Sequence, residues 1–155
     1  MHIRVLAVGG RQPAWVTDAF SEYAGRLPRN WQFRVQEIPL ANRGRQRTPQ
    51  SKDQESEAIL AALRNNERMI ALDEHGKQPD SLQLSTWLSD WQGDGRDICL
   101  VIGGPDGLSS ACLDAAERRW SLSRLTLPHG LVRVMLAEQL YRAWTLQTGH
   151  PYHRA

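Results

Sequence analysis

The sequence predicts an α/β fold in which helices flank a mostly parallel sheet. Short apolar runs alternate along the chain with longer amphipathic segments, and this alternation is typical of strand–helix–strand units with right-handed crossovers. Residues 98–102, Ile-Cys-Leu-Val-Ile, are apolar without interruption, as in strands that are covered on both faces. A chain of 155 residues also has the size of one domain, so we expect residues 1–155 to fold as a single unit.

Five segments are expected to be extended, because each is a short apolar or alternating run bounded by turn-forming residues. They are Ile3–Val8, Phe33–Ile38, Met69–Leu72, Ile98–Ile102 and Trp120–Leu127. Five other segments carry apolar side chains at helical spacing. They are Pro13–Gly25, the residues from Ser51 to Leu63, Ser81–Trp91, Ser109–Glu117 and Leu131–Leu146. Pro13 suits a first helical turn, Gly25 suits a helix end, and Ser51 is the expected N-cap of the second helix.

The composition is that of an ordinary globular chain, with 41% hydrophobic and 23% charged residues. No apolar run approaches the roughly 20 residues that cross a bilayer. Residues 1–8 are interpreted as a first strand, because the stretch is too short for a signal peptide, and a cytoplasmic location is expected. Cys99 and Cys112 lack the spacing of a metal site or a disulfide framework. We expect both to be reduced cysteines that pack in the interior.

Positive charge gathers toward the two ends of the chain. The formal net charge is only +2, yet residues 1–50 hold eight basic and three acidic side chains, and residues 120–155 hold four and one. Seventeen of the 19 basic residues are arginine, which binds phosphate through two N–H groups and stacks on bases. A GC-rich genome also explains a preference for arginine. The segregation of charge, however, points to an anionic partner.

A glycine-rich loop, Gly-Gly-Pro-Asp-Gly at 103–107, follows the uninterrupted apolar strand, and Leu-Asp-Glu-His-Gly at 72–76 follows another. The carboxyl ends of parallel strands form one edge of a sheet, where ligands bind, and glycine there allows close approach. The loop matches neither the dinucleotide fingerprint nor the P-loop, so dinucleotide and ATP chemistry are disfavoured. Adjacent side chains such as Asp73, Glu74 and His75 rarely face one ion, and no metal site is predicted.

Two further segments carry groups suited to ligands. Ser121–Leu127 is mostly apolar, and its backbone amides and carbonyls suit an adenine edge, although a plain core strand has the same pattern. The chain then ends in a cluster of polar side chains, His150, Tyr152, His153 and Arg154. Residues at the end of a chain are usually poorly ordered. Histidine and tyrosine also transfer protons, and Arg154 together with Arg142 suits a phosphate group.

Seven short motifs, in their order and spacing, resemble the SPOUT methyltransferases. The resemblance is closest to the small single-domain family that methylates N3 of a pseudouridine in large-subunit ribosomal RNA. Each motif alone is weakly diagnostic, but together they span essentially the whole chain. The motifs are Leu6–Gly9, Leu72–Asp73, Ile102–Leu108, Leu125–His129, Leu131–Val134, Glu138–Ala143 and Pro151–His153.

The resemblance implies a fold and a cofactor that composition does not reveal. It implies a C-terminal trefoil knot, which departs from the rule that chains do not thread loops, and a homodimer with Leu131–Leu146 as the dimer helix. It also implies that S-adenosylmethionine binds in a bent conformation between the knot loops. By the same resemblance the cofactor lies against Leu72, Gly103, Leu122, Ser123, Arg124, Leu125, Thr126 and Leu127.

The implied reaction needs neither a metal nor a nucleophilic cysteine, because the methyl group is already activated on a sulfonium. The N3 atom of the base must lose its proton and be aligned with the methyl carbon. We expect His153 to be the base or a proton relay, Tyr152 to orient the nucleobase, and Arg142 and Arg154 to contact phosphate or carbonyl oxygens. His129 is a secondary candidate. The sequence leaves open whether this tail completes its own pocket or a partner's.

A net charge of +2 is low for an enzyme that binds free RNA, but the resemblance implies that the assembled ribosome is the substrate. Arg43, Arg45 and Arg47 are then expected to contact 23S rRNA. Two alternatives stay open: a SPOUT methyltransferase for transfer RNA or another ribosomal position, and a ribosome-associated binding protein without activity. Cofactor binding distinguishes the second alternative, because a pure binding protein need not hold S-adenosylmethionine.

Overall fold

One five-stranded sheet organises the chain, and every neighbouring pair of strands is parallel. The computed structural model describes residues 1–41 and 49–154. Within them the strand order is β2-β1-β4-β3-β5. The strands are β1 Ile3–Val8, β2 Arg34–Ile38, β3 Arg68–Lys77, β4 Ile98–Ile102 and β5 Arg118–Trp120. The predicted α/β class, with a parallel sheet and flanking helices, is therefore confirmed.

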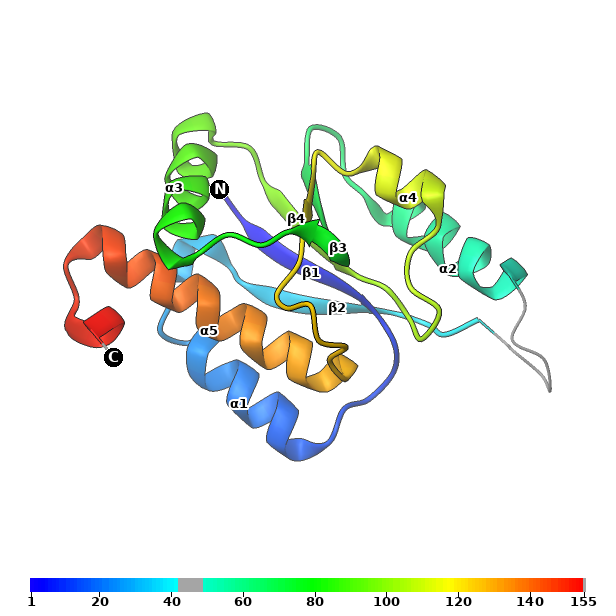
Figure 1. The fold of residues 1–155 in the computed structure, drawn as a ribbon, viewed down its shortest axis with the longest axis horizontal. Coiled ribbons are helices and arrows are strands. Elements are labelled where there is room, and N and C mark those ends of the chain that lie inside the picture. The colour runs from blue at the N-terminus through cyan, green and yellow to red at the C-terminus, as the bar shows by residue number, and fades with distance from the viewer. Residues whose placement is uncertain (42–48, 155) are drawn as a thin grey trace.

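Helices cover both faces of the sheet (Figure 1). The helices are α1 Ala14–Ala24, α2 Pro49–Ala62, α3 Ser81–Asp94, α4 Ser110–Ala115 and α5 His129–Thr148, with short 3-10 turns at η1 Arg29–Trp31 and η2 Pro151–Arg154. Helices α1, α3 and α5 lie on one face, and α2 and α4 lie on the other. In the part of the chain that is described, no helix has the length and apolarity needed to cross a membrane.

The two faces explain why β4 is apolar throughout. Ile98, Leu100 and Ile102 belong to the core beneath α3 and α5, whereas Cys99 and Val101 belong to the core beneath α2 and α4. Successive side chains of a strand point to opposite faces, so both sets are buried. The cysteine prediction is confirmed, because Cys99 and Cys112 are both free and buried.

The prediction of a strand at Trp120–Leu127 is wrong beyond Trp120, because β5 ends at that residue. The hydroxyl of Ser121 donates to the carbonyl of Ser123 at 2.9 Å, and the Ser123 hydroxyl accepts from the amide of Leu125 at 2.9 Å. These local bonds take the place of a strand ladder. Residues 121–128 instead form a loop that leads to α5 (Figure 1).

Two other boundaries also differ from expectation. Ser51 does not cap α2, because the helix begins at Pro49 and the Ser51 side chain is buried within it. Residues 73–76 do not simply follow β3 but belong to it, since Leu72 and Lys77 both pair with Trp120 across an irregular stretch. A Cβ atom on Gly76 would lie 2.6 Å from the carbonyl carbon of Arg119. This close approach of two backbones requires glycine. The trefoil knot stays a prediction.

Candidate functional site

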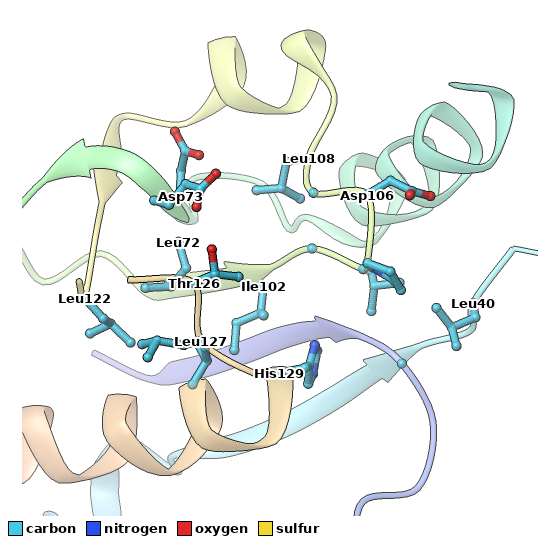
Figure 2. Close-up of a pocket in the computed structure, with 18 of the residues that line it drawn as sticks. Leu40, Leu72, Asp73, Ile102, Asp106, Leu108, Leu122, Thr126, Leu127 and His129 are labelled. Atoms are coloured by element: carbon cyan, nitrogen blue, oxygen red, sulfur yellow. The ribbon is translucent and has the colours of Figure 1, made fainter. Parts of the chain in front are cut away.

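A cavity of about 770 Å³ opens at the carboxyl ends of β1, β3 and β4 (Figure 2). This volume lies within the range of small-molecule sites, roughly 300–1,000 Å³. Its walls come from the residues after β1, from Leu72–Glu74 of β3, from the loop 102–108 after β4 and from the loop 122–127. The position agrees with the rule that ligands of parallel sheets bind beyond the carboxyl ends of the strands.

The glycine loop forms one wall from backbone rather than side chains. Gly107 donates its amide to the carbonyl of Gly104 at 2.9 Å, which closes a tight turn. A Cβ atom on Gly103 would lie 2.8 Å from the carbonyl carbon of Gly107, and Gly107 itself has a φ of +80°. Both positions therefore need glycine. The turn presents peptide groups to the cavity at close range.

The loop 121–128 forms the facing wall, and most of the predicted cofactor residues lie here. Seven of the eight line the cavity together: Leu72, Gly103, Leu122, Ser123, Leu125, Thr126 and Leu127. Arg124 does not, because its side chain lines a second, smaller cavity beside Glu74, His75, Gly76 and Gln78. The leucine side chains give this wall an apolar surface, and the local hydrogen bonds of Ser121 and Ser123 hold its shape.

The residues that follow β1 line the cavity but were not among the residues predicted from the sequence. Gly9, Gly10, Arg11 and Gln12 line the cavity. Their sequence signal was present, since Gly9 and Gly10 end an apolar strand in the same way as Gly103 and Gly104. The rule that ligands bind beyond the carboxyl ends of parallel strands predicts these residues when it is applied to β1 as well as to β4.

His129, the first residue of α5, faces the cavity from below in Figure 2. Its Nε2 accepts a 2.9 Å hydrogen bond from Nε of Arg133, and the Arg133 Nη1 donates at 3.1 Å to Oε1 of Glu37. Burial and the adjacent Arg133 guanidinium lower the pKa of His129. No sequence signal predicted this contact, because Glu37 and Arg133 lie 96 positions apart.

The predicted catalytic residues lie elsewhere, and none of Arg142, Tyr152 and His153 lines the cavity of its own chain. The C-terminal turn η2 packs near the far end of α5 (Figure 1). Tyr152 contacts Glu138, nine residues beyond His129, and nine helical residues span about 14 Å. Arg142 and Tyr152 do gather around the Glu138 carboxylate.

Polar contacts order the tail around Glu138. Its Oε1 accepts from Nη2 of Arg142 at 2.7 Å and from the Tyr152 hydroxyl at 2.9 Å. The Arg142 guanidinium lies 5.0 Å from the centre of the Tyr152 ring. Burial, with hydrogen bonds to Tyr23 and Glu138, raises the pKa of Tyr152. Nδ1 of His153 is enclosed and has no hydrogen-bond partner within residues 1–41 and 49–154.

The chain matches, over residues 1–153, the family model described as "Predicted SPOUT methyltransferase". It belongs to the SPOUT methyltransferase family. Two relatives share the name "Ribosomal RNA large subunit methyltransferase H". The protein from Hahella chejuensis is 49% identical over 155 residues, 99% of each chain. The protein from Alkalilimnicola ehrlichii is 53% identical over 156 residues, all of each chain.

A solved structure supports the fold. The probable methylase family protein from Haemophilus influenzae Rd KW20 superimposes with a TM-score of 0.57 at 12% identity, over 97% of this chain and 69% of that one. The predicted SPOUT family and the methyltransferase class of this enzyme are thus confirmed. S-adenosylmethionine is the methyl donor predicted for this SPOUT methyltransferase, and its membership of the family supports that prediction. In the part of the chain that is described, no three His, Cys, Asp or Glu side chains gather to hold a metal ion.

Proposed function

We propose that this SPOUT methyltransferase transfers a methyl group from S-adenosylmethionine to N3 of a pseudouridine in 23S rRNA, within the assembled ribosome. The observation that carries the proposal is the single cavity that brings seven predicted cofactor residues together at the strand ends. The names of two relatives, about half identical over the whole chain, support ribosomal RNA of the large subunit as the substrate. We further propose that residues 1–155 act as one domain in the cytoplasm.

The cavity fits the cofactor in size and in chemistry. Its two facing walls are the backbone turn at 103–107 and the apolar loop at 122–127. Peptide N–H and C=O groups suit the polar edge of an adenine, while Leu72, Leu122 and Leu127 suit its faces. S-adenosylmethionine, when bound, supplies a methyl group already activated on a positively charged sulfur.

The chain's own residues have to hold N3 in line with that methyl group and remove its proton. We assign the proton transfer to His153, whose enclosed Nδ1 has no partner among the described residues. Arg142 and Tyr152 are assigned to the substrate's carbonyl or phosphate oxygens and to orientation of the nucleobase. His129 is not assigned as the base, because its Nε2 lone pair is already taken by Arg133.

A homodimer would explain how the tail residues can act at a cavity that they do not line in their own chain. Because Tyr152 and His153 do not line the cavity of their own chain, we propose that the tail of one chain completes the cavity of its partner. Leu125, which lines the cavity, and Trp15 on α1 are large apolar side chains that are 73% and 57% exposed in the single chain. Burial of such side chains favours association. The expected RNA contacts Arg43, Arg45 and Arg47 lie outside the described residues and stay a proposal.

The proposal is tested with labelled S-adenosylmethionine and ribosomes from a strain that lacks the modification. Naked 23S rRNA and transfer RNA from the same strain are the comparison substrates, and the product is mapped by nuclease digestion and mass spectrometry. We expect transfer to a pseudouridine in ribosomes and little or none in the other two. Transfer to transfer RNA instead, or cofactor binding without any transfer, would contradict the substrate.

A further inference from the structure

Three side chains from distant segments meet beside the cavity, and His129 is the one of them that lines it. Glu37 comes from β2, and His129 and Arg133 come from the first turns of α5. Arg133 donates to both neighbours, through Nε to Nε2 of His129 at 2.9 Å and through Nη1 to Oε1 of Glu37 at 3.1 Å. His129 in turn lines the cavity, as Gly103 does. The contacts therefore run from β2 to the wall of the cavity.

Because Arg133 is buried, its guanidinium needs hydrogen-bond partners within the protein. Arg133 is only 5% exposed, and a buried guanidinium is costly unless it is paired and hydrogen-bonded. Gly9 lies against it, with a φ of +149° that strongly favours glycine, and a Cβ atom there would be 3.7 Å from Nη2 of Arg133. The hydrogen bonds to His129 and Glu37 therefore fix the position of the guanidinium.

The contacts also determine the protonation of the imidazole. Arginine can only donate, so Nε2 of His129 must accept and carries no proton. The proton is then on Nδ1, the nitrogen left to donate, and the backbone of Gly103 favours a proton on this ring. Protonation of Nε2 would place two N–H donors and two positive charges against each other.

We propose that Glu37, Arg133 and His129 form a positioning relay that holds Gly103 at the distance the cofactor needs. Glu37 orients Arg133, Arg133 selects the neutral Nδ1–H form of His129, and His129 holds the Gly103 carbonyl. This inference rests on the proposed function only in taking S-adenosylmethionine as the ligand. The residues act through the cavity wall and need not touch the cofactor.

The charges around His129 are few. From α5 it meets Arg133, and from β2 it meets Glu37, with opposite effects on its charge. The other charged side chains that line the cavity are Arg11, Asp73, Glu74 and Asp106. Of these charges, Arg133 and Glu37 are the ones that shift the pKa of His129. Substitutions of the two are therefore expected to move its titration in opposite directions.

The first test compares His129→Leu with His129→Asn by calorimetric titration of S-adenosylmethionine. Asparagine keeps an N–H close to the position of Nδ1, whereas leucine keeps only bulk. We expect leucine to weaken binding by about tenfold and asparagine by less than about threefold. The same loss is expected for 5′-methylthioadenosine, which lacks the amino-acid part of the cofactor, because a displaced wall affects both ligands.

The outcomes separate this inference from the proposed function. If His129→Leu binds both ligands as the wild type does, the relay is wrong. If it loses affinity for S-adenosylmethionine alone, His129 contacts the amino-acid part directly and the positioning role is overturned. If the wild type binds neither ligand, the proposed function fails first.

The second test follows the His129 ring by NMR titration of the protein without ligand. Arg133→Met is expected to raise the pKa of His129 toward its ordinary value, and Glu37→Gln to lower it further, because each removes one of the opposed charges. Glu37 is 43% exposed, so Glu37→Gln keeps the test informative if Arg133→Met does not fold. An unchanged titration in the folded variants would overturn the relay.

Discussion

The hydroxyl of Tyr152 donates a 2.9 Å hydrogen bond to Oε1 of Glu138, the oxygen that also accepts from Arg142. The Tyr152 ring lies 4.6 Å from the ring of Tyr141, centre to centre. These contacts hold the last turn of the chain against α5. The proposed catalytic groups are thus ordered within one chain, at a distance from that chain's own cavity.

Tyr152→Phe removes this hydrogen bond and keeps the ring. We expect the single-turnover rate of methyl transfer to fall by about tenfold, because a hydrogen bond to a charged group contributes roughly 1.5–3 kcal/mol. Affinity for S-adenosylmethionine should not change, since Tyr152 is assigned to orientation of the nucleobase and not to the cofactor. Rapid-quench kinetics and calorimetry measure the two quantities. Thr86→Ala, which alters a hydroxyl on the exposed side of α3, is the control. A parallel loss of cofactor affinity would contradict the assignment.

Mixing two inactive variants tests whether the tail serves the partner chain. His153→Ala keeps its cavity, and a Gly103→Val chain keeps its tail, so a mixed dimer has one complete site if sites are shared. After random subunit exchange we expect about a quarter of the wild-type rate, since half of the dimers are mixed and each has one competent site of two. Absence of any recovery, with mixed dimers shown by mass spectrometry, means that each chain builds its own site.

Gly103→Ala tests the backbone wall of the cavity. The added Cβ atom would lie 2.8 Å from the carbonyl carbon of Gly107 and 3.0 Å from Leu108 Cδ2, so the turn has to open. We expect the affinity for S-adenosylmethionine to fall by at least about tenfold, with a smaller loss of thermal stability. Gly93→Ala in α3 is the matched control, because nothing lies within 4 Å of its new Cβ. Wild-type affinity in Gly103→Ala would place the cofactor away from this turn.

Acid should weaken the folded state through His129. Burial and Arg133 lower its pKa in the folded protein, while the unfolded chain titrates near about pH 6.5. The contribution to the free energy of unfolding is therefore complete above that value and is lost as the pH falls toward the folded pKa. Urea unfolding at a series of pH values should show a shallower acid decline in His129→Asn than in the wild type. Identical declines would show that His129 is not the source.

Both cysteines should be unreactive in the folded protein. Burial raises the pKa of Cys99 to about 12 and that of Cys112 to about 11, so almost no thiolate forms at pH 8. An aromatic disulfide reagent should label neither residue until a denaturant is added, after which both react. Fast labelling of the native protein would mean that the interior opens readily on the time scale of the reagent.

The elements of this fold could largely be predicted from local patterns. The runs Ile3–Val8 and Ile98–Ile102 are strands with the expected bounds, because a strand buried on both faces has to be apolar throughout. The exception is Ser121–Leu127, where serine hydroxyls bond nearby backbone groups and the chain leaves the sheet. Apolar content alone does not distinguish such a loop from a strand.

Sequence by itself determined the α/β class, through its periodicity, and the position of the glycine loop at the edge where parallel strands end. The resemblance to the SPOUT family supplied the predicted cofactor residues, seven of which line the cavity. Only the tertiary structure decided that Arg124 lies outside that cavity, that the tail lies away from it, and that Arg133 joins Glu37 to His129. Each of these relationships depends on how separate segments pack in space. A buried charge such as Arg133 pairs with a residue that is distant in the sequence. Residue spacing along the chain does not indicate which residue that is.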